Sequence, residues 1–299
     1  MTKSLNVFSA KQVLQGWSAQ INSKFMGYYA LTLAVITFGL MALGSATRVM
    51  DAGLACPDWP LCFGAVIPAE QMDLQVFLEW FHRVVASVVG FLTLGMAVLA
   101  WWRRSTLPAW LPWASLGAVA LVITQGILGG LTVTRFLQFE IVTAHLGTGL
   151  AFFSYLLVVG WKCLMHEANQ IYPLTVVGSI SAVLVYGQSL LGGVVASRWA
   201  VHQCLDSQEF CGVVANHLWG IIPASLGMIV VAIVAWRRFT LGSVGVLLLW
   251  LLQLSIGYST YKLQLSVPAL TVMHQAVGAL LLGSLITLTT LSTRSPRLE

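Results

Sequence analysis

Charged side chains are scarce in this sequence. Only 8% of its 299 residues are Asp, Glu, Lys or Arg, and 58% are hydrophobic, whereas a soluble globular domain carries roughly 25% charged residues. A water-soluble core cannot hide this much apolar surface, so we expect lipid around most of the chain. The net charge of +5 follows from the distribution of loop charges and does not indicate a nucleic-acid partner.

Other patterns are missing too. A membrane β-barrel would show alternating segments of about ten residues, and the sequence has none. Zinc sites need three or four His, Cys or Asp ligands, usually at short spacing, and no such cluster is present. No cleavable secretory signal is visible. Residues 1–26 are mostly polar and basic, which favours a short cytoplasmic lead; an organellar transit peptide is the alternative.

Long apolar stretches are present instead. Each is about 20 residues long, enough for a helix to cross a hydrocarbon core of about 30 Å. In lipid, backbone groups need internal hydrogen-bond partners, so these spans are predicted to be helices. The predicted spans are 27–47, 77–100, 111–132, 141–162, 174–196, 213–235, 241–260 and 269–290. The fold class is therefore an all-α membrane protein with eight transmembrane helices.

Loop charges predict the orientation. With both termini on one side, ten Lys and Arg lie on that side and five on the other, while eight of the ten acids lie opposite the termini. Positive residues gather in cytoplasmic loops, so we expect cytoplasmic termini. We therefore expect a multi-pass integral protein of a prokaryotic plasma membrane.

The chain contains an internal repeat of four spans. In each copy the same features follow in order: a glycine and an arginine at the end of the first span, two cysteines, a histidine in the second span, Gln-x-x-x-Gly in the third, and a histidine in the fourth. The copies predict two tandem, pseudo-symmetric four-helix bundles. The predicted parts are a lead (1–26), a first half (27–162), a cytoplasmic linker (163–173), a second half (174–290) and a cytoplasmic tail (291–299).

Four histidines lie inside the predicted spans, all near the outer face: His82, His145, His217 and His274. A single such residue is often only a polar group hydrogen-bonded to a neighbouring helix, but an ionisable group at membrane depth is a functional candidate. Two imidazoles on facing helices of a bundle can hold a heme from both sides. The repeat pairs His82 with His145, and His217 with His274, which predicts two heme sites.

Three arginines lie close to these histidines: Arg48, Arg83 and Arg198. Guanidinium groups form bidentate pairs with carboxylates, so we expect contacts with heme propionates. The alternative is that their side chains only extend to the membrane interface.

The cysteine pairs Cys56/Cys62 and Cys204/Cys211 lie in outer loops. Disulfides form readily outside the cytoplasm, so two loop disulfides are expected. Their role stays open between a structural link and a redox-active bond.

Glu79 is the clearest difference between the halves. It precedes His82 by three residues, so both lie on one helix face, and Val214 occupies the matching position of the second half. An exposed interfacial carboxylate is the ordinary interpretation. A catalytic carboxylate beside a reactive heme is the functional one, and it makes the first half the candidate reaction site.

These motifs resemble those of the heme A synthase family. The resemblance covers about residues 27–290 and is carried by Cys56-Pro-Asp-Trp-Pro-Leu-Cys62, Glu79-Trp-Phe-His82-Arg83, Thr143-Ala-His145, Asn216-His217 and Met273-His274. Asn216-His217-Leu218 departs from the His-Arg pair that the family often has there.

The resemblance implies an oxidoreductase that converts heme O to heme A for cytochrome oxidase assembly. In such enzymes the C8 methyl group becomes a formyl group through two hydroxylations and loss of water. The resemblance places the substrate, heme O, between His82 and His145, and a resident heme B between His217 and His274. It implies a catalytic role for Glu79. Expected partners are membrane lipid, a heme O synthase and an electron donor that the sequence does not identify.

Two other functions compete with this one. A diheme b-type cytochrome that only transfers electrons explains the four histidines but gives Glu79 no role. A transporter built on the repeat would need a broken span or a charge near the membrane centre, and the sequence has neither.

Overall fold

The computed structural model describes residues 22–165, 172–196 and 208–293. Within these ranges the chain forms long helices, one short 3-10 turn, η1 (Ala69–Gln71), and no strand. The helices are α2 (Ser23–Val49), α3 (Leu74–Trp102), α4 (Trp110–Thr134), α5 (Phe139–Leu164), α6 (Pro173–Val195), α8 (Gln208–Ala235), α9 (Thr240–Lys262) and α10 (Pro268–Ser292).

The eight predicted spans are confirmed. Each matches one helix that is long and apolar enough to cross a membrane. Most helices run a few residues past the predicted ends, and polar side chains cap the first turn of α2 and α3. The side chain of Asn22 accepts a hydrogen bond from the Phe25 amide, and that of Asp73 accepts one from the Val76 amide, as helix N-caps do.

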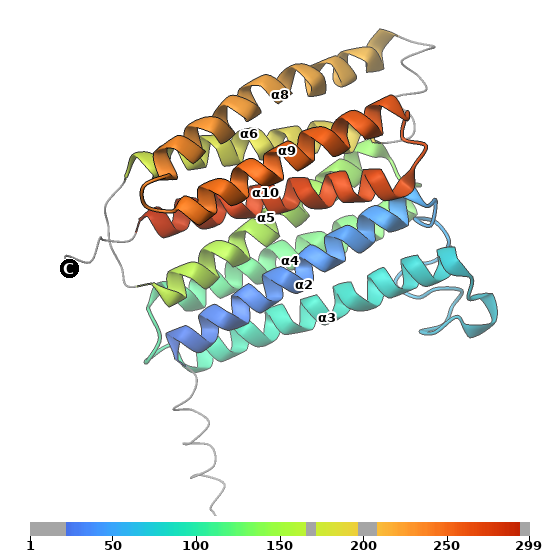
Figure 1. The fold of residues 1–299 in the computed structure, drawn as a ribbon. Helices are drawn as coiled ribbons and strands as arrows, with labels where there is room; N and C mark the ends of the chain where they lie inside the picture. Colours follow the sequence, from blue (N-terminus) through green and yellow to red (C-terminus); the bar gives the residue numbers. More distant parts are fainter. Residues whose placement is uncertain (1–21, 166–171, 197–207, 294–299) are drawn as a thin grey trace, which may run out of the picture.

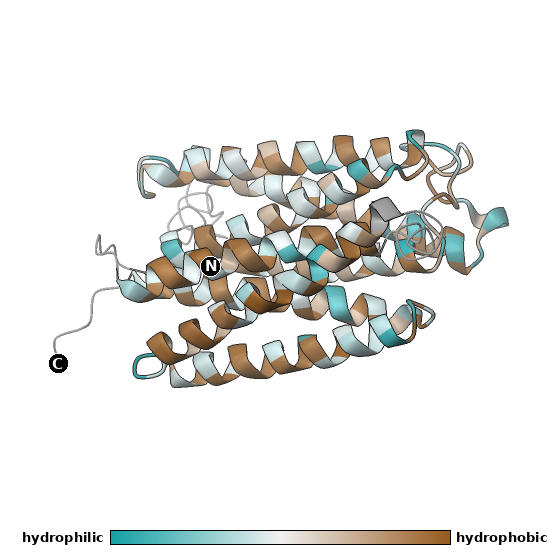
Figure 2. Ribbon diagram, turned by 90° about the horizontal axis from the view of Figure 1, so that it is seen from above, coloured by the Kyte–Doolittle hydropathy of each residue, from teal (hydrophilic) through white to brown (hydrophobic). Residues whose placement is uncertain are grey.

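The helices lie side by side with their connecting loops at two opposite ends (Figure 1). Strongly polar residues lie mainly at these ends, whereas the helix bodies are mostly apolar (Figure 2). Large apolar side chains point outward along the bodies: Phe91 is 75% exposed and Val35 is 69% exposed. Such a surface is stable in lipid and not in water.

The helices pack in the same pattern in both halves of the chain. In the first half, α2 packs on α3 and α5, and α4 completes the ring by packing on α3 and α5. In the second half, α6 packs on α8 and α10, and α9 packs on α8 and α10. The halves meet where α2 and α5 contact α10, and where α5 contacts α6. Two apolar cores result, one within α2–α5 and one mostly within α6–α10.

The turns after α4 and α9 provide a second match between the halves. Phe136 and Leu137 follow α4 with φ of 49° and 57°, and Gln264 and Leu265 follow α9 with φ of 48° and 60°. Positive φ is uncommon for residues other than glycine. Two consecutive examples at equivalent places therefore indicate one turn used twice.

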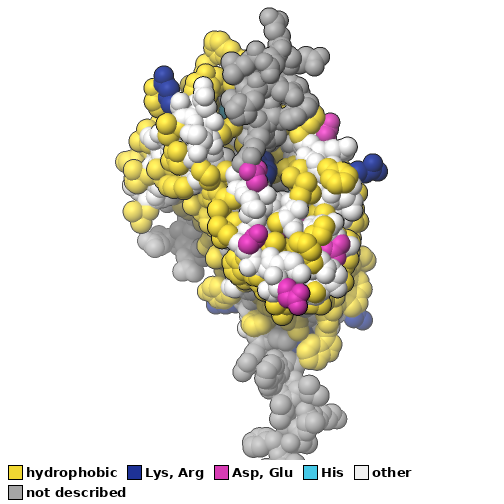
Figure 3. Space-filling view, turned by 90° about the vertical axis from the view of Figure 1, so that its right-hand side faces the viewer, with side chains coloured by type: hydrophobic (Ala, Val, Ile, Leu, Met, Phe, Trp, Pro, Cys, Tyr) yellow, Lys and Arg dark blue, Asp and Glu magenta, His cyan; other side chains and the backbone are white. Residues whose placement is uncertain are grey.

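The described acidic side chains lie between α2 and the first turns of α3 and at the start of α5, which is one end of the molecule. Several of them are visible on that end in Figure 3. The arginines that follow α3 and α8 lie at the opposite end. This separation is the charge asymmetry read from the sequence. The cytoplasmic placement of the termini stays a prediction, and most of the lead, the tail and part of the linker lie outside the described residues.

Helices α2 and α5 approach closely at the end opposite the acidic side chains. A Cβ atom on Gly27 would lie 2.8 Å from the Leu164 side chain and 3.0 Å from the Gly160 carbonyl oxygen.

We therefore expect Gly27→Val to lower the free energy of unfolding by about 1–3 kcal/mol, as overpacking does. Thermal unfolding in detergent measures this change. Gly39→Val, on the same helix and facing open space, is the matched control; equal melting temperatures would contradict the prediction.

Candidate functional site

Each of the four membrane histidines packs edge-on against a glycine of the helix that precedes its own. A Cβ atom on that glycine would lie close to the Cε1 atom of the ring. The pairs are Gly44 with His82 (2.8 Å), Gly129 with His145 (3.5 Å), Gly192 with His217 (3.1 Å) and Gly257 with His274 (2.7 Å). The counterpart of Gly44 is therefore Gly192. The next residue, Gly193, packs against Leu146 instead.

Three of the four histidines also contact a glutamine that lies one helical turn before the glycine. The Gln125 amide donates to the His145 carbonyl oxygen at 2.8 Å, and the Gln188 amide donates to the His217 carbonyl oxygen at 2.9 Å. The amide nitrogen of Gln253 lies 3.3 Å from Nε2 of His274. The internal repeat predicts this motif only in the third span of each half, but Gln188-Ser-Leu-Leu-Gly192 in the first span of the second half carries it as well.

The two histidines of each half lie close enough to interact electrostatically. The interacting pairs are His82 with His145 and His217 with His274. In all four rings Nδ1 is buried and lacks a hydrogen-bond partner. A buried polar atom without a partner costs free energy. The same orphaned atom at four matched places fits rings that are built to hold a ligand.

The donor set indicates the kind of ligand. Among the described residues no three His, Cys, Asp or Glu side chains are grouped as a metal-ion site. Two imidazoles per half instead suit a metal that brings four ligands of its own and lacks two, as the iron of a heme does. The residues present therefore fit a heme in each half.

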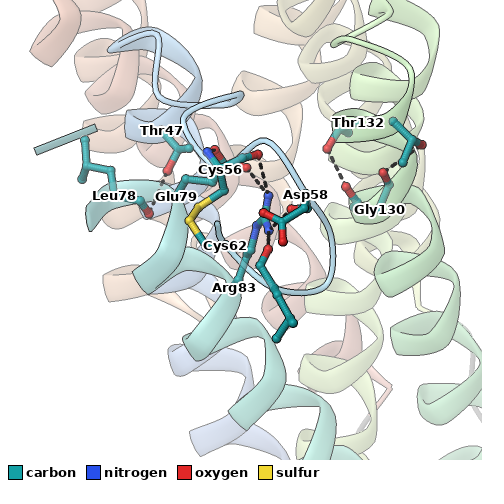
Figure 4. Close-up of polar contacts among 12 residues, drawn as sticks. Thr47, Cys56, Asp58, Cys62, Leu78, Glu79, Arg83, Gly130 and Thr132 are labelled. Carbon is teal, nitrogen blue, oxygen red and sulfur yellow. Dashed lines mark hydrogen bonds and ion pairs between the residues drawn. A yellow bond between two sulfur atoms is a disulfide. The ribbon is translucent and has the colours of Figure 1, made fainter. Parts of the chain in front are cut away.

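Glu79 lies beside the first pair, buried at 4% exposure. One carboxylate oxygen accepts a hydrogen bond from the Cys56 amide at 2.8 Å, and the other forms a 2.5 Å ion pair with Arg83 (Figure 4). The alternative interpretation, a carboxylate exposed at the interface, is thus wrong. Glu79 ties α3 to the loop that carries the first cysteine pair, and Val214 has no group that could do the same.

Arg83 also binds the loop that carries the first cysteine pair. Its guanidinium donates to the carbonyl oxygens of Asp58, Leu61 and Cys56 as well as to Glu79. In this structure the side chain therefore holds the loop backbone, and contact with a heme propionate stays a prediction.

We call residues 50–73 the cap loop, because they cover the end of the first bundle that carries the acidic side chains. The ring of Trp59 lies against Gly130 of α4, and Gly53 lies against Leu137 in the turn after α4. On the α3 side, the Trp80 indole donates to the Val66 carbonyl oxygen at 2.7 Å. The cap loop thus reaches from α3 to α4, and Gly130 adjoins the glycine that faces His145.

The Cys56–Cys62 disulfide is confirmed. Both residues are buried, at 0% and 2% exposure, so the bond lies inside the cap loop and not on its surface. Cys211 is also disulfide-bonded, and Cys204 lies outside the described residues. Cys163, at the opposite end of the molecule, is a free thiol.

Arg48 connects the two halves. Its guanidinium donates to the Gly193 carbonyl oxygen at 3.3 Å, while its Nε atom is buried without a partner. A second link lies close by, where the Ser45 hydroxyl donates to Gln275 at 2.9 Å. The predicted contact of Arg48 with a heme propionate stays a prediction. Arg198 lies outside the described residues.

Comparison with known proteins identifies the family. Residues 27–286 match the model of the cytochrome oxidase assembly protein family. The chain belongs to this family. It is 29% identical to a heme A synthase of Shewanella oneidensis over 85% of this chain and 92% of that protein. It is 27% identical to a heme A synthase of Rhizorhabdus wittichii over 86% of this chain and 91% of that protein.

Part of the chain is also similar to an enzyme of another name. Over 138 residues it is 33% identical to a protoheme IX farnesyltransferase of Haloarcula marismortui, which covers 46% of this chain and 28% of that protein. Membership of the cytochrome oxidase assembly protein family, together with eight apolar helices, establishes a multi-pass membrane protein of the heme A synthase group.

The contacts of Arg83 with the cap loop generate a prediction. Arg83→Lys removes the planar donor group that binds several carbonyl oxygens at once. We expect the Cys56–Cys62 bond to be reduced about tenfold faster by a water-soluble phosphine, because hydrogen bonds to charged groups contribute roughly 1.5–3 kcal/mol. Arg135→Lys, the same exchange at the same end of the molecule, is the control. Equal reduction rates in both variants would show that Arg83 does not hold the loop.

Proposed function

We propose that this protein is an oxidoreductase that converts heme O to heme A by oxidising the C8 methyl group to a formyl group. One observation carries the proposal: both halves bring two histidines together, but the first half adds the buried carboxylate of Glu79 where the second half has Val214. A protein that only passes electrons between two hemes has no need of this difference. The family and the names of the relatives agree with the proposal.

In this proposal His82 and His145 hold the substrate, heme O, under the cap loop. His217 and His274 hold a resident heme B, which supplies one-electron transfer when it is bound. The matched glycines give all four rings the room to lie between helices. Both sites lie toward the end that carries the acidic side chains, which the charge bias places outside a prokaryotic plasma membrane.

Glu79 has two tasks in this proposal. Its hydrogen bond to Cys56 and its ion pair with Arg83 fix the cap loop over the first site. As a buried carboxylate three residues before His82, it is also the group available to accept or donate a proton during the oxidation. The loop excludes water from the site while the methyl group reacts.

The partners follow from the substrate. A heme O synthase would supply heme O. One protein named protoheme IX farnesyltransferase contains a segment similar to part of this chain, and the presence of that segment in such an enzyme supports this partner. Membrane lipid surrounds the helices. An electron donor of unidentified nature would serve the resident heme.

Pigment analysis tests the function. The chain is expressed with and without a source of heme O, and the hemes extracted from the purified protein are separated and identified by mass. We expect heme A only when heme O is supplied. Bound heme without any heme A in both cases would favour the diheme cytochrome, and a purified protein without a Soret band would favour the transporter.

Glu79→Gln separates the two tasks of the carboxylate. Glutamine can still accept the hydrogen bond from the Cys56 amide, but it cannot carry a proton as a carboxylate does. We expect normal heme binding and heme A formation reduced about 100-fold or more, the usual contribution of a general acid or base. Heme A formation at the normal rate in this variant would leave Glu79 with a purely structural role.

The glycine at His274 provides a test of the second site. A methyl group at position 257 would meet the His274 ring, so Gly257→Ala must displace it. We expect heme B affinity at this site to fall about 10- to 100-fold, as it does when the surroundings of a metal ligand are altered. Titration with heme B, followed by the Soret band, measures the affinity. Gly245→Ala, on the same helix and facing open space, is the control; equal weakening in both variants would contradict an effect through the His274 ring.

A further inference from the structure

The pairing of each histidine helix with the helix before it follows one motif, and one of the four pairs breaks it. In three pairs the preceding helix carries Gln-x-x-x-Gly. The glycine faces the histidine, and the glutamine faces a second glycine that lies three or four residues after the histidine. The second glycines are Gly149 for Gln125, Gly220 for Gln188 and Gly278 for Gln253. The two helices thus interlock at the histidine.

The pair formed by α2 and α3 keeps only half of this motif. Gly44 faces His82 as in the other pairs, but the position of the glutamine is Leu40 and the position of the second glycine is Ala86. His82 is therefore the one histidine of the four that no glutamine amide holds.

Further contacts beside His82 come from α2, where the Thr47 hydroxyl donates to the Leu78 carbonyl oxygen at 3.4 Å, and from the cap loop. Glu79 and Arg83, three residues before His82 and one after it, bind the loop backbone. In this pair the cap loop, together with α2, fixes this part of α3, and no glutamine side chain contributes. Loops open at lower free energy than packed helices do, so the support of His82 includes a less rigid element and lacks the glutamine amide.

We propose that His82 is the exchangeable ligand of the first site, released when a heme enters or leaves, while the glutamines keep the other three histidines in place. This inference rests on the proposed function, in which heme O must enter the first site and heme A must leave it, whereas heme B stays in the second. Leu40 and Ala86 are then positioning residues whose effect is to leave His82 free to move.

Heme release from the full-length protein tests the inference. The purified protein is loaded with heme B at both sites, and transfer to excess apomyoglobin is followed by absorbance. We expect a fast and a slow phase. His274→Ala assigns them, because it should remove the slow phase and keep the fast one. Loss of the fast phase in that variant would overturn the inference.

Restoring the motif provides the decisive variant. We expect Leu40→Gln with Ala86→Gly to slow the fast phase about 3- to 15-fold, the range that a hydrogen bond between membrane helices provides, and to leave the slow phase unchanged. Leu40→Met, which adds no amide, should change neither phase. A fast phase that is unaffected by the restored motif, or slowed equally by Leu40→Met, would overturn the inference.

The reciprocal change covers the case in which the double variant does not fold. Gln253→Leu removes the amide at His274, and we expect it to accelerate the slow phase by a similar factor; an unchanged slow phase contradicts the inference. The proposed function can be overturned independently of this inference. Release phases that behave as expected in a protein that forms no heme A would overturn the synthase activity and leave the assignment of His82 intact.

Discussion

An imidazole ring at membrane depth needs space between two helices, and in this protein a glycine on the facing helix provides it. At Gly44, Gly192 and Gly257 a Cβ atom would lie within 3.1 Å of the ring, so a larger residue there would force the histidine or the helix to shift. This contact fixes which helices pair and where each ring lies. The placement of two rings in each bundle, and hence the two candidate heme sites, depends on it.

The halves share this contact and differ in what surrounds it. The second half holds both of its histidines with glutamines, which suits a group that stays bound. The first half holds only His145 in this way and places His82 beside Glu79, Arg83 and the cap loop. We infer that a duplicated heme-binding bundle has kept one copy as a fixed site and adapted the other to receive a substrate.

The sequence predicted the parts of this structure that follow from hydrophobicity and repetition. Eight apolar stretches gave eight helices, and the repeat singled out the four histidines. It could not predict that Glu79 is buried, because that depends on hydrogen bonds from the Cys56 amide and Arg83 that form only in the folded chain. The motif at Gln188 is present in the sequence, but its role could not be predicted, because it depends on the Gln188 side chain reaching His217 on the next helix.

The most direct test of this account is a count of bis-histidine hemes. Electron paramagnetic resonance of the purified, heme-loaded protein should show two low-spin signals. His145→Ala should remove one of them and His217→Ala the other, because each heme would be held within one half. A single variant that abolishes both signals, or a pair of variants that abolish the same one, would contradict the assignment of one heme to each bundle.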